Sequence, residues 1–155
     1  MAKQLRRDIR ALLLAPSSDL AVQVDERLRR LGFPSLRPSH SQLLTLVEDG
    51  GKRLTDLVDA MHLPKQTLGD MVDELERQKL VERYPDPDHG VIKRVRLATR
   101  GRAWAHEVRK VAETTEARWA AALGKAKLKT LRGLLEELGT QINGVSEHGS
   151  NGRRS

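Results

Sequence analysis

Residues 54–101 decide the fold of this chain, and they read "LTDLVDAMHLPKQTLGDMVDELERQKLVERYPDPDHGVIKRVRLATRG". Two short amphipathic helices are predicted at 56–61 and 64–78, because their apolar residues recur at steps of three and four. The turn between them spans only residues 62–64, and Pro64 suits the first turn of a helix, where a backbone N–H has no helical partner. Two helices joined by about three residues form a helix-turn-helix.

A β-hairpin follows directly on the second helix. We expect a strand at 80–84, a turn rich in Pro, Asp and Gly at 85–90, and a returning strand at 91–98. This order is the outline of a winged helix-turn-helix, with residues 81–98 as the wing. The predicted fold class is therefore mainly α with a small antiparallel β-hairpin, and nucleic acid is the expected partner.

The helix at 64–78 is the expected recognition helix, since the major groove admits one helix and the N-terminal residues of that helix reach the base edges. Gln pairs with adenine, Lys reaches guanine or a phosphate, and Thr contacts a thymine methyl group or a phosphate. Asp70 either selects cytosine, through its N4 donor, or points elsewhere, because a carboxylate repels phosphates. The residues expected to face DNA are Lys65, Gln66, Thr67, Gly69 and Asp70. An ordinary solvated helix face is the alternative interpretation.

The wing carries a local cluster of basic side chains. Strand alternation places Arg94 and Arg96 on one face and the apolar Val95 and Leu97 on the other, so the arginines face solvent or phosphate. The expected DNA contacts in the wing are Arg83, His89, Lys93, Arg94 and Arg96. The alternative is a charged edge strand that resists aggregation and needs no ligand.

Further helices are expected before this region. A helix at 3–14 should end at Pro16, and residues 17–19 offer N-caps for a second helix that runs to Leu31. A third helix ends near Glu48, where two glycines follow it.

Two long helices are expected after the wing, at 100–123 and 125–142. The leucines of the last helix recur at steps of three and four, close to a heptad seam, which indicates a partner helix. The expected organisation is an N-terminal extension at 1–18 that belongs to the dimerisation region, a winged-helix domain at 19–142 and a disordered tail at 143–155. Within the domain, residues 52–101 form the DNA-binding lobe and residues 102–142 the dimerisation helices.

These motifs resemble the multiple-antibiotic-resistance regulator (MarR) family of winged-helix transcription factors. The segment "LVERYPDPD" at 80–88 is similar to the family's strand into the wing, and "KRVRL" at 93–97 to its strand out. Upstream, "VDERLRRLGFPSLRPSHSQLLTLV" at 24–47 resembles the first two helices of the family, so the likeness covers about 19–142. The resemblance implies a homodimer with intertwined terminal helices, which binds a pseudo-palindromic operator and is released by a small, often aromatic, acidic ligand.

Two departures from the family pattern concern DNA contacts. The family's wing-tip arginine, which enters the minor groove, aligns with Val91, and His89 and Lys93 are the nearest substitutes. Gly69 and Asp70 stand where the family often has a polar residue followed by arginine. An altered or weakened operator preference is therefore expected.

A third departure is structural. The glycine that usually follows the recognition helix is Lys79, and the threonine that usually follows the returning strand is Ala98. Thr99 offers a helix cap one residue later.

The resemblance also implies a ligand pocket between the dimer helices and the DNA-binding lobe. The candidates there are Phe33, His40, Leu44 and Trp104. Apolar residues at helical spacing are also typical of plain core, which is the alternative for each of them.

The composition of the chain narrows the classes of protein to which it can belong. The net charge of +7, from 28 Lys and Arg against 21 Asp and Glu, favours a polyanionic partner. Residues 52–100 nevertheless carry ten basic and nine acidic residues, so DNA contacts must come from a local cluster or be shared with the terminal segments. The absence of cysteine excludes disulfides, thiolate zinc sites and thiol sensing. With no apolar run long enough for a signal peptide or a membrane span, a soluble, cytoplasmic protein is expected.

No pattern in the chain supports an enzyme, a cofactor or a metal site. The string at 51–53 lacks the other residues of a phosphate-binding loop, and the five histidines show no paired spacing on a helix. Asp86 and Asp88 resemble paired carboxylates, yet an alternating Pro-Asp-Pro-Asp run is turn chemistry first.

The sequence thus predicts a dimeric DNA-binding transcriptional regulator, most often a repressor in such proteins, that reads DNA through the helix 64–78 and the wing. The rival prediction, from another class, is a MarR-like protein-interaction module that has lost sequence-specific DNA binding.

Overall fold

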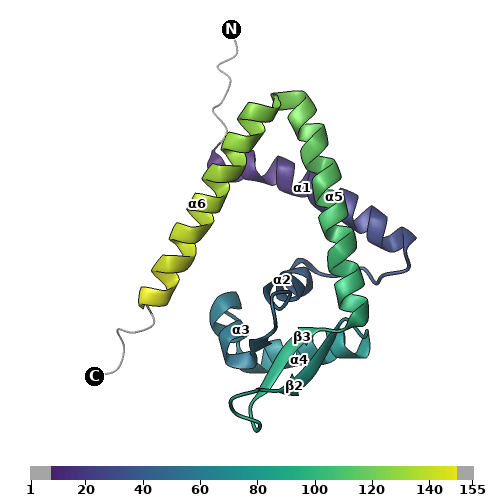
Figure 1. Ribbon diagram of the computed structural model, residues 1–155, viewed down its shortest axis with the longest axis vertical. Coiled ribbons are helices and arrows are strands. Elements are labelled where there is room, and N and C mark those ends of the chain that lie inside the picture. The colour runs from purple at the N-terminus through teal and green to yellow at the C-terminus, as the bar shows by residue number, and fades with distance from the viewer. Residues whose placement is uncertain (1–7, 150–155) are drawn as a thin grey trace. The chain divides into compact units, whose positions relative to one another are not determined.

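The computed structural model describes residues 8–149, which divide into two compact units between Ala112 and Glu113. The first unit holds most of the secondary structure and the second consists of helix alone (Figure 1). In chain order the elements are α1 (Ile9–Arg30), α2 (Pro38–Leu46), β1 (Lys52–Arg53), α3 (Leu54–Met61), α4 (Lys65–Arg77), β2 (Val81–Pro85), β3 (Lys93–Leu97), α5 (Thr99–Leu123) and α6 (Lys125–Gly149). The predicted fold class, mainly helical with a small antiparallel sheet, is confirmed.

The wing is a three-stranded antiparallel sheet in the order β1-β3-β2. Strand β3 pairs with β2 on one side, where Arg83 lies opposite Val95, and with β1 on the other, where Arg53 lies opposite Arg94. Gly51 precedes β1 with a φ of 78°, and an added Cβ would lie 2.7 Å from the carbonyl oxygen of Val95. Only glycine allows the chain to approach β3 so closely in this conformation.

The core of the first unit is aliphatic and joins α2, α3, α4 and the sheet. Its fully buried side chains include Leu43, Leu44, Leu57, Leu68, Leu75 and Leu80. Each leucine buried in this way stabilises the fold by about 1.5–3 kcal/mol relative to an exposed one. On α4 the buried residues are Leu68, Met71, Val72 and Leu75, which orients the helix and leaves its opposite face in solvent.

Both helices of the helix-turn-helix end at a residue with a left-handed backbone conformation. His62 has a left-handed conformation, with a φ of 53°, and ends α3. Lys79 ends α4 in the same way, with a φ of 61°, and the N–H of Leu80 then donates to the carbonyl of Leu75 at 2.9 Å. Lys79 therefore adopts a backbone conformation that favours glycine, at a cost of about 1–2 kcal/mol.

The returning strand is shorter than predicted, since it begins at Lys93 and not at Val91. The N–H of Ile92 donates to the carbonyl of His89 at 2.8 Å, and the N–H of Asp86 donates to the carbonyl of Ile92 at the same distance. These bonds close a turn, so Val91 and Ile92 belong to the wing tip.

Helix α1 continues through Pro16, so the predicted break there was wrong. It replaces the two helices that were predicted at 3–14 and from residues 17–19 onward. Pro16 lies inside α1, where it removes a single hydrogen bond, to the carbonyl of Leu12. Asp8 caps the start of the helix by accepting the N–H of Ala11 at 2.8 Å, and Leu28 packs into the core near its end. Support at both ends keeps the helix continuous. The part of the predicted helix at 3–7 lies outside the described residues.

The last helix extends seven residues beyond the predicted end at Ile142, into residues 143–149 of the predicted tail. No proline interrupts this segment, Gly144 costs only about 1 kcal/mol in a helix, and adding residues to an existing helix is easy. Residues 150–155 of the predicted tail lie outside the described part.

Candidate nucleic-acid interface

The exposed face of α4 presents four of the five residues of this helix that are expected to contact DNA. Burial of Leu68 and Met71 turns Lys65, Gln66 and Thr67 into solvent. Asp70 is also exposed, and Gly69 is half-buried. The side-chain amide of Gln66 donates to Oδ1 of Asp70 at 3.0 Å, which places both side chains on one line along the helix.

Arg83 of β2 turns toward the second half of α4. Its Nη1 lies 2.5 Å from Oε2 of Glu76, and its Nη2 lies 2.6 Å from Oδ1 of Asp73. The same two carboxylates and Arg77 line a shallow surface pocket. Arg83 therefore joins the wing to α4, and its charge is balanced within the molecule.

Asp86 is the centre of the ionic contacts at the base of the wing. Its side chain is fully buried, and Oδ2 accepts a hydrogen bond from Nε of Arg53 at 2.7 Å. Nη1 of Arg94 lies 3.6 Å from the same oxygen, and the N–H of Asp88 donates to Oδ1 at 2.9 Å. The hydrogen bond from Arg53, followed by that from Asp88, lowers the pKa of Asp86 from 3.8 to about 2.

The two remaining wing arginines also have partners. Arg94 donates to the carbonyl of Gly51 at 2.9 Å, which ties β3 to the chain before β1. Arg96 donates to Oε1 of Glu82 at 2.7 Å, and its guanidinium lies 4.4 Å from the centre of the Tyr84 ring. Arg96 is nevertheless exposed, so one face of its guanidinium remains accessible.

Two lysines, unlike these arginines, have side chains without an ion-pair partner among the described residues. Lys65 at the start of α4 and Lys93 at the start of β3 are exposed, and within residues 8–149 no ion pair engages them. His89 is exposed at the wing tip, next to Val91, whose exposed fraction is 95%. The structure thus places Lys65, Lys93 and His89 free at the surface, whereas Arg83, Arg94 and Arg96 are held by carboxylates or carbonyls.

The four residues expected in a ligand pocket lie in or beside the core of the first unit. Leu44 and Trp104 are buried members of the hydrophobic cluster, and Phe33 packs against it. His40 is 1% exposed, and its Nε2 lies 3.1 Å from Oε2 of Glu74. Nδ1 of His40 and Nε1 of Trp104 are buried with no hydrogen-bond partner.

Glu74 is shared between two partners. The hydrogen bond from His40 is the main cause that lowers the pKa of Glu74, and Arg37 adds a contact at 2.9 Å. An ionised Glu74 accepts from Nε2, so Nε2 carries the proton and Arg37 cannot donate to it. In the neutral imidazole, Nδ1 is then a bare acceptor inside the protein.

Sequence reasoning missed the structural roles of Arg53, Asp86 and Glu74. The alternating prolines and aspartates at 85–88 were a usable signal, because a carboxylate in a turn between strands that carry arginines is expected to bind one of them. No local signal indicates Glu74 as the partner of His40, since the two residues are 34 positions apart.

Metal sites and membrane-spanning helices are both absent from the part of the chain that the structure describes. No group of three or more His, Asp or Glu side chains there is arranged to hold a metal ion. None of the helices there combines the length and the apolar composition that crossing a bilayer requires.

The helix-turn-helix, the wing and the exposed face of α4 together define a winged-helix protein. Residues 35–90 match the sequence model of the MarR family, and the fold around this segment is similar to the crystal structure of MarR. No curated protein sequence matches the chain.

Solved structures support this fold over most of the chain. A probable transcriptional regulator from Pseudomonas aeruginosa is 26% identical, with a TM-score of 0.59 over 84% of this chain and 96% of its own. Apo MarR from E. coli is 19% identical, with a TM-score of 0.62 over 86% and 98%. A variant of S. aureus MepR, bound to an oligodeoxyribonucleotide, is 18% identical, with a TM-score of 0.57 over 88% and 99%. These likenesses show that the chain has the fold of these proteins.

Proposed function

We propose that this protein is a homodimeric repressor in the cytoplasm that binds a pseudo-palindromic operator. The observation that carries the proposal is the exposed start of α4, where Lys65, Gln66 and Thr67 face solvent on a helix anchored by its buried opposite face. Helix α4 enters the major groove, and the wing follows the neighbouring backbone. Within residues 8–149, no ion pair engages Lys93 of the wing, so its charge is available for a phosphate.

Selection from genomic DNA, followed by salt titration of the enriched site, tests this function. A true operator binder prefers its site over random DNA by about 10³-fold or more. Absence of any enriched site would contradict the proposal.

Lys65→Ala and Lys93→Ala should each weaken binding to all sequences. Each lysine that neutralises one phosphate contributes about one unit to the slope of log K against log salt, so each variant should lose about one unit. Fluorescence anisotropy over a range of salt concentrations measures the slope.

Arg29→Ala is the matched control for these variants. It removes one exposed cation near the end of α1, outside α4 and the wing, and should leave the slope unchanged. If the slope of log K against log salt is equal in all three variants, Lys65 and Lys93 do not contact phosphates.

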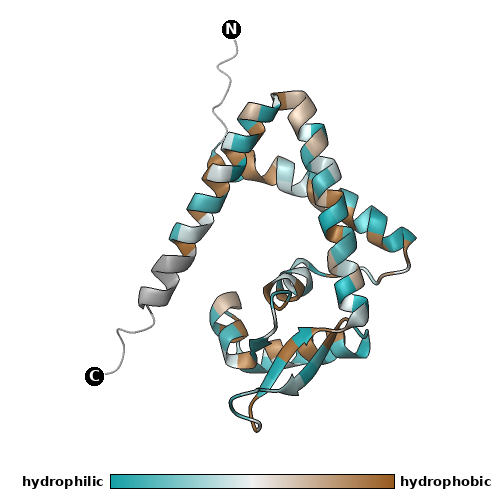
Figure 2. Ribbon diagram, viewed as in Figure 1, coloured by the Kyte–Doolittle hydropathy of each residue, from teal (hydrophilic) through white to brown (hydrophobic). Residues whose placement is uncertain are grey.

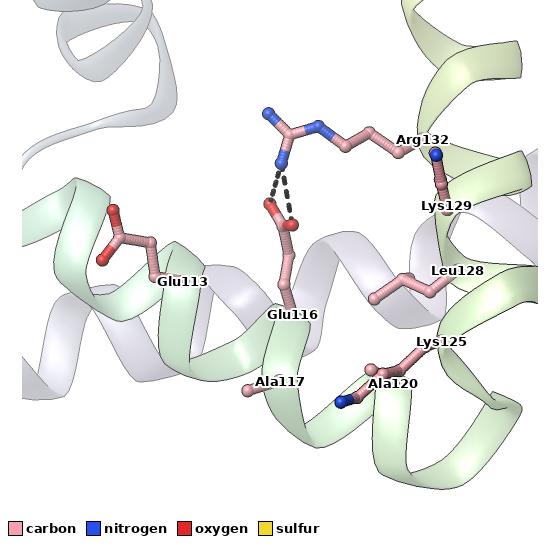
Figure 3. Close-up of a pocket in the computed structure, with 8 residues that line it drawn as sticks. All are labelled: Glu113, Glu116, Ala117, Ala120, Lys125, Leu128, Lys129 and Arg132. Carbon is pink, nitrogen blue, oxygen red and sulfur yellow. Dashed lines mark hydrogen bonds and ion pairs between the residues drawn. The ribbon is translucent and has the colours of Figure 1, made fainter.

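The dimer is supported by large apolar side chains that are exposed in the described part of the chain. Figure 2 shows apolar residues recurring along α6, and its exposed large members are Leu131, Leu134, Leu135, Leu138 and Ile142. At the junction of α5 and α6, Ala117, Ala120 and Leu128 line an open pocket of about 410 Å³ (Figure 3). A second copy that supplies apolar helices would bury both surfaces, and exposed Leu12, Leu13 and Leu14 of α1 are suited to this role.

The double variant Leu135→Glu/Leu138→Glu should convert the dimer to a monomer, because it buries two unpaired carboxylates in the proposed interface. Light scattering at micromolar concentration measures the mass. Thr140→Glu/Gln141→Glu adds the same charge at exposed polar positions of α6 and should remain dimeric. A wild-type monomer would contradict both the dimer and the palindromic operator.

Release by a small aromatic acid is part of the proposal. It is supported by Nδ1 of His40 and Nε1 of Trp104, which are buried with no hydrogen-bond partner, and by the apolar Leu44 and Phe33, which belong to or pack against the same hydrophobic cluster as Trp104. Titration with aromatic carboxylates, followed by tryptophan fluorescence and operator release, tests it.

The alternative function is a protein-interaction module. The internal pairing of Arg83, Arg94 and Arg96 favours it, because these cations then attract DNA weakly. A shallow salt slope without an enriched DNA site would support this alternative.

A further inference from the structure

Gln66 and Asp70 form an exposed pair on the face of α4 that would meet the bases. They are four residues apart, and Nε2 of Gln66 donates to Oδ1 of Asp70 at 3.0 Å. An ionised carboxylate only accepts hydrogen bonds, so the nitrogen and not the oxygen of the amide must face Asp70. Asp70 therefore determines which way the amide of Gln66 points.

This contact leaves a defined set of groups on Gln66 for a base. One N–H of the amide is used by Asp70, and one N–H and the oxygen Oε1 remain. Adenine presents an acceptor, N7, and a donor, N6–H, at its major-groove edge, which complement one N–H and one oxygen. Guanine presents two acceptors, N7 and O6, and would need the second N–H that Asp70 already holds.

Gly69 leaves the space beside this pair open. It lies three residues after Gln66, on the same side of α4, and an added Cβ would have no neighbour within 4 Å. Packing therefore does not require glycine here, although glycine inside a helix costs about 0.5–1 kcal/mol relative to alanine. The missing side chain lets a base edge approach Gln66.

We propose that Asp70 is a positioning residue that directs the amide of Gln66 toward adenine and prevents it from accepting guanine at the same base pair. This inference rests on the proposed function of α4 as an operator-reading helix. Asp70 itself contacts no base. Its negative charge lowers affinity for all DNA, and in exchange the helix gains specificity.

The experiment uses the enriched operator and the full-length protein. The base pair that Gln66 contacts is the position at which Gln66→Ala binds operators carrying each of the four bases with equal affinity. At that position, adenine is replaced by guanine, by 7-deazaadenine, which lacks N7, or by purine, which lacks the N6 amino group. Dissociation constants of the wild type, Asp70→Asn and Asp70→Ala are then compared at fixed salt.

We expect the wild type to bind about tenfold or more weakly when adenine is replaced by guanine, as for one bidentate contact. Asp70→Asn should keep this preference for adenine over guanine, because the asparagine oxygen still accepts a hydrogen bond from Gln66. Asp70→Ala should lose most of the preference. Both variants should bind random DNA more tightly, since both remove the same charge. This common gain separates the effect of charge from that of positioning.

Three outcomes would overturn the inference while operator binding stands. They are an adenine-to-guanine ratio that is unchanged in Asp70→Ala, equal loss of that ratio in Asp70→Asn and Asp70→Ala, and a preference for cytosine that depends on Asp70. A wild type that selects no DNA sequence would overturn the proposed function together with the inference.

Discussion

Gly101→Ala is expected to lower the free energy of unfolding by about 3 kcal/mol, the upper part of the range for overfilled sites. Gly101 is buried at the start of α5, and an added Cβ would lie 1.9 Å from the carbonyl oxygen of Leu80 and 3.2 Å from a methyl group of Leu97. That carbonyl cannot move freely, because it accepts the N–H of Ala98 at 3.0 Å. The variant must therefore shift α5 away from the strand that begins the wing. Urea unfolding followed by circular dichroism measures the change.

Gly69→Ala provides the matched control. It makes the same substitution inside a helix of the same unit, where an added Cβ has no neighbour within 4 Å. It should stabilise the protein by about 0.5–1 kcal/mol through helix propensity alone. If Gly101→Ala also leaves stability unchanged or raises it, the close contact between α5 and Leu80 is wrong.

Asp86→Ala is expected to disrupt the wing and weaken operator binding by about tenfold or more, as for the loss of one hydrogen bond to a charged group. The substitution leaves Arg53 and Arg94 facing each other across β1 and β3 without their shared carboxylate. Like charges directly opposite in a sheet repel, so the pairing of β1 with β3 weakens. Hydrogen exchange of the β3 amides and anisotropy with operator DNA measure the two effects.

Asp88→Ala serves as the control, because its exposed side chain can be removed while its N–H still donates to Asp86. It should change the exchange of β3 amides and operator binding only slightly. Equal effects of the two variants would show that the turn, and not the buried carboxylate, holds the wing.

The pH dependence of stability should report the same carboxylate. The pKa of Asp86 is about 2 in the folded protein, below its ordinary value of 3.8. A lowered pKa stabilises the fold fully above the unfolded value, so this contribution should be lost as pH falls from about 4 to about 2. Asp86→Asn should show a shallower loss of stability in that window. If the free energy of unfolding falls equally steeply with pH in the wild type and in Asp86→Asn, the ionic role of Asp86 is contradicted.

Helix α4 follows from a local pattern in the sequence. The spacing of Leu68, Met71, Val72 and Leu75 predicts α4 to within one residue at each end. This works because α4 buries one face, and the repeat of apolar residues along a helix is a local property. The prediction at Pro16 failed because the continuity of α1 depends on Asp8 and on the packing of Leu28 as well as on local propensity.

The candidate site was predictable only in part. The exposed positions of Lys65, Gln66 and Asp70 follow from helical phase, and those of Arg94 and Arg96 from strand alternation. Their partners do not follow from either pattern. Asp86 was interpreted as a turn residue, and the structure places it between two arginines.

Local patterns were enough to predict a winged helix-turn-helix, because the spacing of apolar residues and the choice of turn residues are properties of short segments. Tertiary structure alone decided which cations remain available for DNA. Arg53 and Asp86 are 33 positions apart, and they meet because β1 pairs with β3 beside the turn that holds Asp86. An ion pair forms wherever the fold brings opposite charges within a few ångströms, so separation in sequence carries no information about it.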